Sequence, residues 1–326
     1  MNILGPCAAE SEEQLLRIAQ RISRVSRASL TIFRAGVWKP RTSPDTFQGV
    51  GDIGLKWLQR VKAEYNLPVA TEVSTPEQVQ KALAAGIDYL WLGARTSANP
   101  ILVQAIADEI AKGSPKGVLI KNPVNEDADL WIGNIQRLTT NCQRPVYAVH
   151  RGCNHHPCWA MAYQLRKKLP EVPLLLDPSH MSGDAGKVAE LCSIADELAY
   201  DGLMIEVHDR PQEALSDAKQ QITPDELEQI MLQSSNGQSS NGQLTWLRRM
   251  MDEVDDTLWE TIARRMNVSR QIGEYKKANG IEVVQPTRFE EIKTKRLAWA
   301  TEHNLSEESV RELLETLHRE SIRQQQ

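Results

Sequence analysis

Residues 174–180, with the sequence LLLDPSH, join an apolar run to residues that can perform chemistry. A buried parallel strand is a continuous apolar run, and α/β enzymes place their reactive groups just past the carboxyl ends of such strands. Asp177 and His180 stand at that position, which makes His180 a candidate metal ligand or acid–base group. A single loop histidine is more often structural, so the case for chemistry depends on whether the other strands also end at reactive residues.

Seven further β-rich apolar runs also lead into reactive residues. The eight expected strands span residues 3–4, 30–33, 68–71, 89–92, 117–120, 145–149, 173–176 and 202–207. The candidate metal ligands at or after these strands are Cys7, His180, Glu206 and Asp217. The candidate anion-binding cations are Lys39, Arg41, Arg95, Lys121 and Arg151. If the strands close into a barrel, all their carboxyl ends meet at one mouth, and both sets share one pocket.

The two sets indicate a metal and an anionic substrate. One thiolate, one imidazole and two carboxylates suit a divalent transition metal of the Mn, Fe, Co or Zn class that acts as a Lewis acid. Cations crowded at one mouth repel each other unless an anion neutralises them, and arginine suits the oxygens of phosphates and carboxylates. A surface charge explains any one of these cations, but it explains their convergence poorly.

The segments between the strands have helical patterns that can position these residues. Examples are residues 12–25, 54–65, 76–85, 100–111, 158–169 and 184–200. Eight strand–helix units, repeating every ~20 to 35 residues, predict an α/β fold of the (β/α)8 TIM-barrel type. A doubly wound sheet is the alternative, but no G-x-G-x-x-G sequence comes after the first strand.

The remainder of the chain predicts a second domain. One more helix is expected at 224–232, with Thr223 as its N-cap. The tandem repeat SSNGQ-SSNGQ at 234–243 has no apolar residue to anchor it and predicts a flexible linker between a barrel at 1–233 and a helical domain at 244–326. That domain has helical patterns at 244–278, 287–303 and 307–325. Three helices alone make a thin core, so we expect a homodimer through this domain at least.

Composition excludes several classes of function. The 326-residue chain has a net charge of -5 and a pI near 5.9, which does not favour nucleic-acid binding. It has no apolar run of the ~18 residues that a membrane span needs and no targeting region, so we expect a cytoplasmic protein without membrane contact. Its five cysteines predict reduced thiols rather than a disulfide framework. Because the first strand begins at once, we expect no regulatory domain before it.

Several motifs carry a resemblance to a known family. They are GPC at 5–7, KPRTSP at 39–44, GART at 93–96, DPSH at 177–180, the strand that contains Glu206, and LSD at 215–217. From residue 1 to about 221 the chain resembles 3-deoxy-D-arabino-heptulosonate 7-phosphate (DAHP) synthases of the type I-beta group. The resemblance implies condensation of phosphoenolpyruvate with erythrose 4-phosphate. The related KDO-8-phosphate synthases look similar but usually carry an A-N-R loop in place of residues 40–42.

The resemblance also implies a role for each motif residue. The metal would be held by Cys7, His180, Glu206 and Asp217. The phosphate and carboxylate of phosphoenolpyruvate would be held by Arg34, Lys39, Arg95, Lys121 and Arg151. Arg41 and Thr42 would contact erythrose 4-phosphate, and Lys39 is the residue of this half that we assign to catalysis.

Residues 244–326 resemble the all-helical AroQ-type chorismate mutases. By position, Arg248, contributed across a dimer, and Arg265 would bind the two carboxylates of chorismate. Lys276 and Gln325 would face its ether oxygen. Arg288 and Ser321 would complete the pocket, and Arg265, Lys276 and Gln325 would be the catalytic residues.

The leading hypothesis is a bifunctional enzyme of aromatic amino acid biosynthesis. It would be a metal-dependent DAHP synthase fused to a chorismate mutase, with feedback inhibition of the synthase by prephenate or chorismate through the helical domain. The mutase family often has acidic residues where this chain has Gln285 and Phe289. A second hypothesis is therefore a weakly active or inactive helical domain that senses prephenate or chorismate and dimerises. A metal aldolase acting on another sugar phosphate is a third, which the KPRTS loop disfavours.

Overall fold

The computed structural model describes residues 1–25, 30–40, 43, 45–233 and 242–326. Contacts divide the chain into two compact units, Met1–Met250 and Met251–Gln326. The division falls inside the long helix α11 (Gly242–Asn279). Residues 234–241 of the expected linker lie outside the described residues, so a flexible linker stays a prediction.

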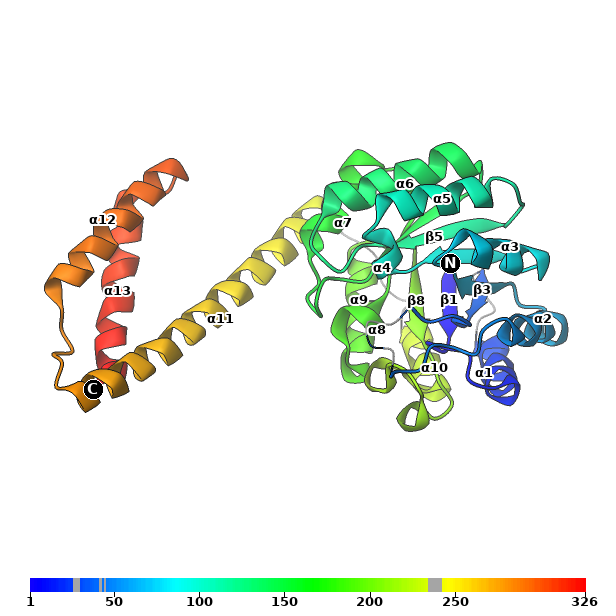
Figure 1. Ribbon diagram of the computed structural model, residues 1–326, viewed down its shortest axis with the longest axis horizontal. Coiled ribbons are helices and arrows are strands. Elements are labelled where there is room, and N and C mark those ends of the chain that lie inside the picture. The colour runs from blue at the N-terminus through cyan, green and yellow to red at the C-terminus, as the bar shows by residue number, and fades with distance from the viewer. Residues whose placement is uncertain (26–29, 41–42, 44, 234–241) are drawn as a thin grey trace. The chain divides into compact units, whose positions relative to one another are not determined.

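The first unit is a closed barrel of parallel strands, which confirms the predicted (β/α)8 fold (Figure 1). The strands are β1 (Asn2–Gly5), β2 (Thr31–Arg34), β3 (Val69–Glu72), β4 (Tyr89–Leu92), β5 (Gly117–Lys121), β6 (Val146–His150), β7 (Leu174–Leu176) and β8 (Gly202–Glu206). They pair in chain order, and β1 closes the ring by pairing with both β2 and β8. Each predicted strand agrees with the structure to within one or two residues at either end.

Helices surround the strands. They are α1 (Glu12–Val25), α2 (Ile53–Tyr65), α3 (Pro76–Ala84), α4 (Ala94–Ser97), α5 (Pro100–Ile110), α6 (Ala128–Cys142), α7 (Trp159–Lys168), α8 (Pro178–Ser182), α9 (Val188–Glu197) and α10 (Pro224–Gln233). Three short 3-10 helices are η1 (Ala185–Lys187), η2 (Pro211–Glu213) and η3 (Ala218–Gln220). Local capping defines several starts: Thr223 accepts a hydrogen bond from the Glu226 amide at the start of α10, as predicted. Helix α6, which the sequence did not single out, begins at the Asp127 cap.

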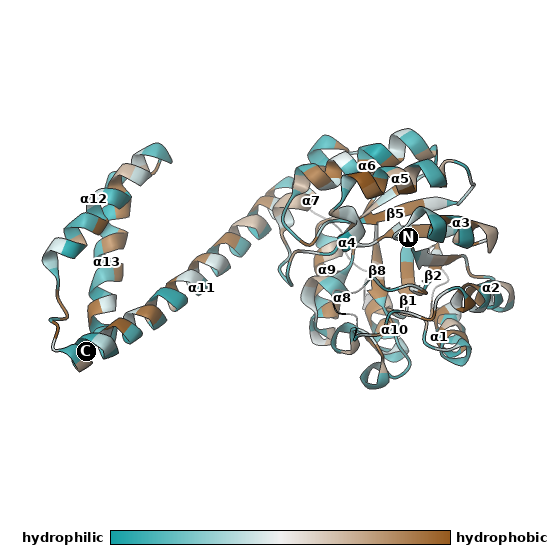
Figure 2. Ribbon diagram, viewed as in Figure 1, coloured by the Kyte–Doolittle hydropathy of each residue, from teal (hydrophilic) through white to brown (hydrophobic). Residues whose placement is uncertain are grey.

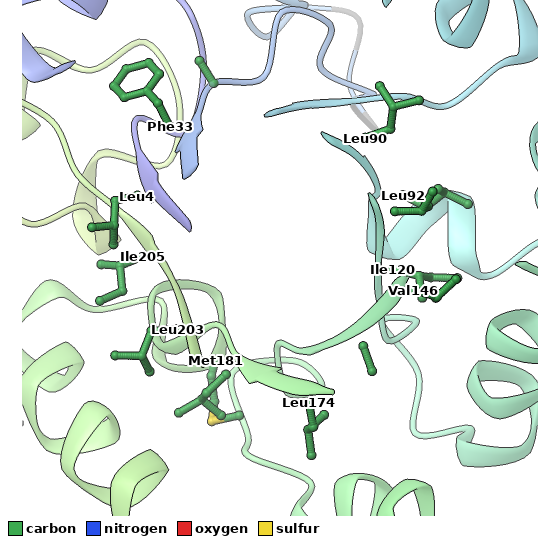
Figure 3. Packing of buried hydrophobic residues seen from close by; sticks show 14 of the residues in the cluster. Leu4, Phe33, Leu90, Leu92, Ile120, Val146, Leu174, Met181, Leu203 and Ile205 are labelled. Atoms are coloured by element: carbon green, nitrogen blue, oxygen red, sulfur yellow. The ribbon is translucent and has the colours of Figure 1, made fainter. Parts of the chain in front are cut away.

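Alternation along each strand separates two apolar layers. Side chains that point outward, such as Leu4, Leu92 and Ile205, pack against the helices on the outer side of the strand ring (Figure 3). The inward residues form a separate cluster inside the ring, made of Ile3, Ile32, Ala70, Tyr89, Trp91, Leu119, Val149, Leu175 and Met204. Because the side-chain period of a strand is two, the residue two positions after an inward residue also points inward. On six strands that position holds a charge: Arg34, Glu72, Lys121, Arg151, Asp177 and Glu206.

The start of α11 packs within the first unit. Trp246 is buried, and its ring lies 5.6 Å from that of Tyr200 and 6.2 Å from that of Trp159, centroid to centroid. Arg249 forms an ion pair with Glu197 of α9 at 2.6 Å. The first residues of α11 therefore belong with the barrel, although the sequence assigns them to the helical domain.

The second unit contains the rest of α11 together with α12 (Pro286–Glu302) and α13 (Glu307–Gln325), in agreement with the predicted helices. Few of its apolar side chains are buried, and Met251, Leu258, Trp259 and Trp299 are exposed. Figure 2 shows apolar residues interspersed with polar ones along α11. Among the described residues, no helix has the length and apolarity needed to cross a membrane.

Candidate active sites

A cavity of about 330 Å³ lies at the carboxyl ends of the barrel strands. Six predicted site residues line it: Lys39, Arg95, Lys121, Arg151, His180 and Asp217. Cys7, Arg34 and Glu206 are buried at 0 to 1% exposure and do not line the cavity wall. Arg41 and Thr42 lie outside the described residues. The structure thus gathers most of the predicted cations around one pocket.

Buried ion pairs organise the floor of this pocket. Lys121 Nζ lies 2.7 Å from Asp177 Oδ2, and Arg34 Nη2 donates to Glu206 Oε1 at 3.0 Å. Burial opposes ionisation of Asp177, but His180 and Lys121 outweigh it and hold the pKa of this carboxyl well below its usual range. Glu206 has a lowered pKa for the same kind of reason: His180 and Arg34 outweigh its burial. Both carboxylates are therefore charged at neutral pH.

The predicted metal ligands form two contacting pairs. Cys7 Sγ donates to Asp217 Oδ2 at 2.9 Å, and His180 Nε2 lies 3.6 Å from Glu206 Oε1. Lys39 Nζ lies 3.0 Å from Cys7 Sγ, and burial raises the pKa of that thiol. Within the described parts of the chain, no three potential ligands are grouped closely enough to hold a metal. The donors fit a transition metal in kind, because they supply sulfur, nitrogen and oxygen at one end of the barrel.

Local geometry explains how two of these donors are placed. Gly5 has φ +146°, and a Cβ there would meet the Arg34 carbonyl oxygen at 2.1 Å, so only glycine lets β1 pass β2 closely before Cys7. The Cys7 amide donates to Gln221 Oε1 at 3.0 Å. Asp177 caps α8 by accepting from the His180 amide at 3.0 Å, and Pro178 occupies the first helical position. The DPSH sequence therefore fixes His180 beside its carboxylate partner.

The sequence did not assign several residues that the structure places at this site. Glu72 is buried and lines the cavity beside Gly93, where a Cβ would meet Glu72 Oε1 at 2.1 Å. Gln220 Nε2 donates to Glu206 Oε2 at 2.8 Å. The position of Glu72, two residues after the inward Ala70, is the signal that could have identified it. Gln220 lies in the 3-10 helix η3, for which no such periodic signal exists.

A second group of polar contacts joins α11 to α13. Arg265 Nη1 donates to the Leu317 carbonyl at 3.1 Å and to Ser321 Oγ. Lys276 Nζ donates to Gln325 Oε1 at 3.0 Å and to the Val283 carbonyl at 2.8 Å. Four predicted mutase residues thus lie together.

A glycine permits this approach of the two helices. A Cβ on Gly273 would lie 2.6 Å from Gln325 Cα, so a larger residue at 273 would push the end of α13 away from α11. Gly273 stands three residues before Lys276 and therefore on the same helix face. Because Gly273 has no side chain, α13 can approach α11 closely enough for Lys276 to donate to the Gln325 amide oxygen.

Two other predicted mutase residues are not part of this group. Arg288 is exposed and pairs with Glu291 at 2.8 Å. Arg248 is exposed and belongs to the first unit, so its contribution across a dimer stays a prediction. His318, which the sequence did not assign, stacks on Phe289 with 3.8 Å between ring centroids. Burial and the charges of Arg265 and Lys276 lower its pKa. Its place on α13, three residues before Ser321, was the available signal.

Comparison with known proteins identifies both regions. The family model described as the DAHP synthetase I family matches residues 1–240. The chain belongs to this family. A second model, described as chorismate mutase type II, matches residues 247–326. This member of the DAHP synthetase I family therefore carries a chorismate mutase region after its barrel.

Individual relatives support the assignment of the barrel. A phospho-2-dehydro-3-deoxyheptonate aldolase of Thermotoga maritima is 29% identical over 226 residues, which cover 68% of this chain and 64% of that protein. The chain thus spans slightly less than two thirds of this relative's length. A 2-dehydro-3-deoxyphosphooctonate aldolase of Desulfatibacillum aliphaticivorans is 30% identical and covers 71% of this chain and 89% of its own. A crystal structure of the Thermotoga aldolase aligns with TM-score 0.63 and 26% identity over 72% of this chain and 67% of that one.

Proposed function

We propose that this protein catalyses two reactions of aromatic amino acid biosynthesis. Its barrel would condense phosphoenolpyruvate with erythrose 4-phosphate to give DAHP and phosphate, and its helical region would rearrange chorismate to prephenate. The observation that carries this proposal is the match of residues 1–240 and 247–326 to one enzyme family each. The clusters of cations in the two regions support it, because every one of the three substrates is an anion.

In the barrel, the chain's own residues would bind and orient the substrates. Lys39, Arg95, Lys121 and Arg151 line the cavity and offer donors to the phosphate and carboxylate of phosphoenolpyruvate. A carbon–carbon bond then forms between the methylene carbon of phosphoenolpyruvate and the aldehyde carbon. Water adds at the carbon that bears the phosphate, and inorganic phosphate leaves. Positioning and fixed positive charge would supply most of the acceleration.

A divalent transition metal is part of the proposal. Cys7, His180, Glu206 and Asp217 would hold it, and it would supply Lewis-acid polarisation of the aldehyde. Its removal by a chelator should abolish condensation and leave chorismate rearrangement unchanged. Cys7→Ser should have the same effect, because a hydroxyl is a much poorer ligand for these metals than a thiolate. Full condensation by metal-free protein would contradict the proposal.

The two relatives are named for products of different length, a heptonate and an octonate, so two aldehyde substrates must be compared. Phosphoenolpyruvate contributes three carbons, so a heptonate product requires a four-carbon aldose phosphate and an octonate product a five-carbon one. The KPRTS sequence at 39–43 favours the four-carbon substrate. The test is to supply the purified full chain with phosphoenolpyruvate and either erythrose 4-phosphate or arabinose 5-phosphate, and to measure phosphate release. Faster turnover of the five-carbon sugar would overturn the assignment to DAHP synthesis.

The helical region would bind chorismate through Arg265 and stabilise charge on the ether oxygen through Lys276 and Gln325. The rearrangement is pericyclic and needs no nucleophile or proton shuttle, so fixed donors suffice. Arg248 would come from a second copy of the chain. The exposed apolar residues of α11 support a homodimer, which light scattering of the full chain measures.

We also propose that prephenate or chorismate, bound at the helical region, inhibits the barrel. The observation that motivates this proposal is that one chain carries both regions in sequence. Typical coupling free energies of ~1 to 3 kcal/mol would weaken substrate affinity about 5- to 150-fold. Condensation rates of the full chain should fall with added prephenate, and Arg265→Ala should remove that response. An unchanged rate in the full chain would show that the two activities are independent.

A sensor without useful turnover is the second candidate for the helical region. The observation in its favour is that Phe289, where the mutase family often has glutamate, stacks on His318 and offers no polar group. Direct assay of chorismate consumption separates the two candidates. Prephenate binding without chorismate turnover would favour the sensor.

A further inference from the structure

Arg34 at the end of β2 is held in an unusual environment. It is 1% exposed, and Nη2 is its only guanidinium nitrogen with a hydrogen bond to another described residue, donated to Glu206. Nε and Nη1 are buried and have no hydrogen-bond partner in the described chain. Buried N–H donors without an acceptor cost free energy, more so on a charged group. The ion pair with Glu206 satisfies one nitrogen only, so a further stabilising contact is needed for the rest of the guanidinium.

That stabilisation comes from Trp91 on β4. The guanidinium carbon of Arg34 lies 4.9 Å from the centroid of the indole ring, within the range of a cation–π interaction. Trp91 is 1% exposed and belongs to the apolar cluster inside the strand ring. Because both groups are excluded from water, the interaction is of the stronger, desolvated kind.

We propose that Trp91 is a positioning residue that holds the Arg34 guanidinium for an anionic substrate. The inference rests on the proposed function and on the role in binding phosphoenolpyruvate that the resemblance to DAHP synthases implies for Arg34. An indole ring attracts a cation without accepting the N–H groups that phosphate or carboxylate oxygens require. A second carboxylate in place of the ring would take up the remaining donors, in addition to the one that Glu206 already accepts.

The neighbouring charges explain why such a neutral platform matters. Glu206 pairs with Arg34 at 3.0 Å, and the buried Asp177 pairs with Lys121 at 2.7 Å. Without the ring, the ion pair with Glu206 alone would hold the guanidinium. Its Nε and Nη1 donors could then turn toward the neighbouring carboxylates instead of staying available to a substrate. Trp91 thus acts through Arg34 and touches no reacting atom.

The test compares three substitutions at Trp91 with one matched control in the full-length protein. Trp91→Phe keeps an aromatic face, Trp91→Leu removes it, and Trp91→Met replaces it with a flexible side chain if the leucine variant fails to fold. Tyr89→Leu removes another aromatic ring from the same strand and the same inward cluster. The readouts are the dissociation constant of phosphoenolpyruvate by calorimetry, the KM and kcat for condensation, and the melting temperature.

We expect Trp91→Leu and Trp91→Met to raise the dissociation constant and KM of phosphoenolpyruvate about 10- to 30-fold, the range of a desolvated cation–π contact. Trp91→Phe should restore most of the affinity. Tyr89→Leu should lower the melting temperature but leave the affinity unchanged. Equal affinities in Trp91→Leu, Trp91→Phe and the parent would overturn the inference, as would an equal loss in Tyr89→Leu. If the parent protein itself neither binds nor converts phosphoenolpyruvate, the proposed function fails, and the inference falls with it.

Discussion

The cations of the barrel pocket and those of the helical site are held by different kinds of partner. In the barrel, Lys121 pairs with Asp177 and Arg34 pairs with Glu206, and every member of these pairs is buried. Such pairs keep the interior close to neutral while they hold several charges in fixed places. A site of this kind can bind an anion on its cations and a metal on its carboxylates.

In the helical region the cations contact neutral oxygens. Arg265 donates to the Leu317 carbonyl and the Ser321 hydroxyl, and Lys276 donates to the Gln325 amide and a backbone carbonyl. Neither cation forms an ion pair with a described residue. The site therefore keeps its positive charge, as the proposed rearrangement of the dianion chorismate requires. The way in which the cations are paired thus differs between the two regions, in keeping with the two proposed reactions.

The largest effect is expected from breaking a barrel pair. Asp177→Asn leaves Lys121 buried without a counter-charge, which should lower the free energy of unfolding by about 3 to 5 kcal/mol. Urea unfolding of the full chain measures it. Asp129→Asn is the matched control, because it removes a solvent-exposed ion pair with Lys168 and should cost less than about 1 kcal/mol. Equal losses in the two variants would contradict the role assigned to the buried pair.

Removal of an unpaired cation should instead affect rate. Lys276→Met should lower the kcat for chorismate rearrangement about 100- to 1,000-fold, as the loss of a preorganised charge-stabilising donor does elsewhere. Condensation in the barrel should be unchanged. Lys277→Met, one residue along on the exposed face of α11, is the control and should keep the parent rate. A normal rate of chorismate rearrangement in the Lys276→Met variant would show that this charge does not stabilise the reacting substrate.

Acid should distinguish the two regions as well. Burial lowers the pKa of His150 to about 3, whereas the unfolded chain binds that proton near pH 6.5. Between these values the unfolded state holds one more proton, so this contribution to stability is complete above pH 6.5 and is lost as the pH falls toward 3. The slope is about 1.4 kcal/mol per pH unit. His150→Asn should flatten the fall in unfolding free energy between pH 6 and 5 by about that amount, whereas His318→Asn should flatten it less, because His318 is only partly buried.

The smallest effect is expected from removing the Ser321 hydroxyl, a neutral partner of Arg265. Ser321→Ala removes one acceptor of Arg265 but no charge, and should lower kcat/KM for chorismate about three- to tenfold, in keeping with a single hydrogen bond. Steady-state kinetics measures it, and Ser309→Ala on the exposed face of α13 serves as control. A loss as large as that of the Lys276 variant would mean that the hydroxyl does more than orient the arginine.

The sequence was sufficient to predict the barrel, because each buried parallel strand is recognised as a short apolar run that is followed by reactive residues. The presence of Lys39 and His180 at the pocket could be predicted in this way, whereas their roles stay predictions. Contacts between elements could not be predicted, since they depend on distances that no local pattern encodes. Lys121 and Asp177 meet from β5 and β7, and Arg34 and Trp91 from β2 and β4. For the same reason the sequence predicted one set of mutase residues that includes Arg288, which the structure leaves apart.

The two-residue step between the inward apolar layer and the charged residues above it governs how this chain tolerates changes in length. A residue inserted between Leu119 and Lys121 would reverse the side on which the lysine emerges, whereas an insertion before Gly117 would only lengthen a surface connection. The barrel thus accepts growth between its strands but not within them. Genetic variation in length should accumulate in the connections, and the spacing from the inward layer to the charged residues should be kept on the six strands that have them.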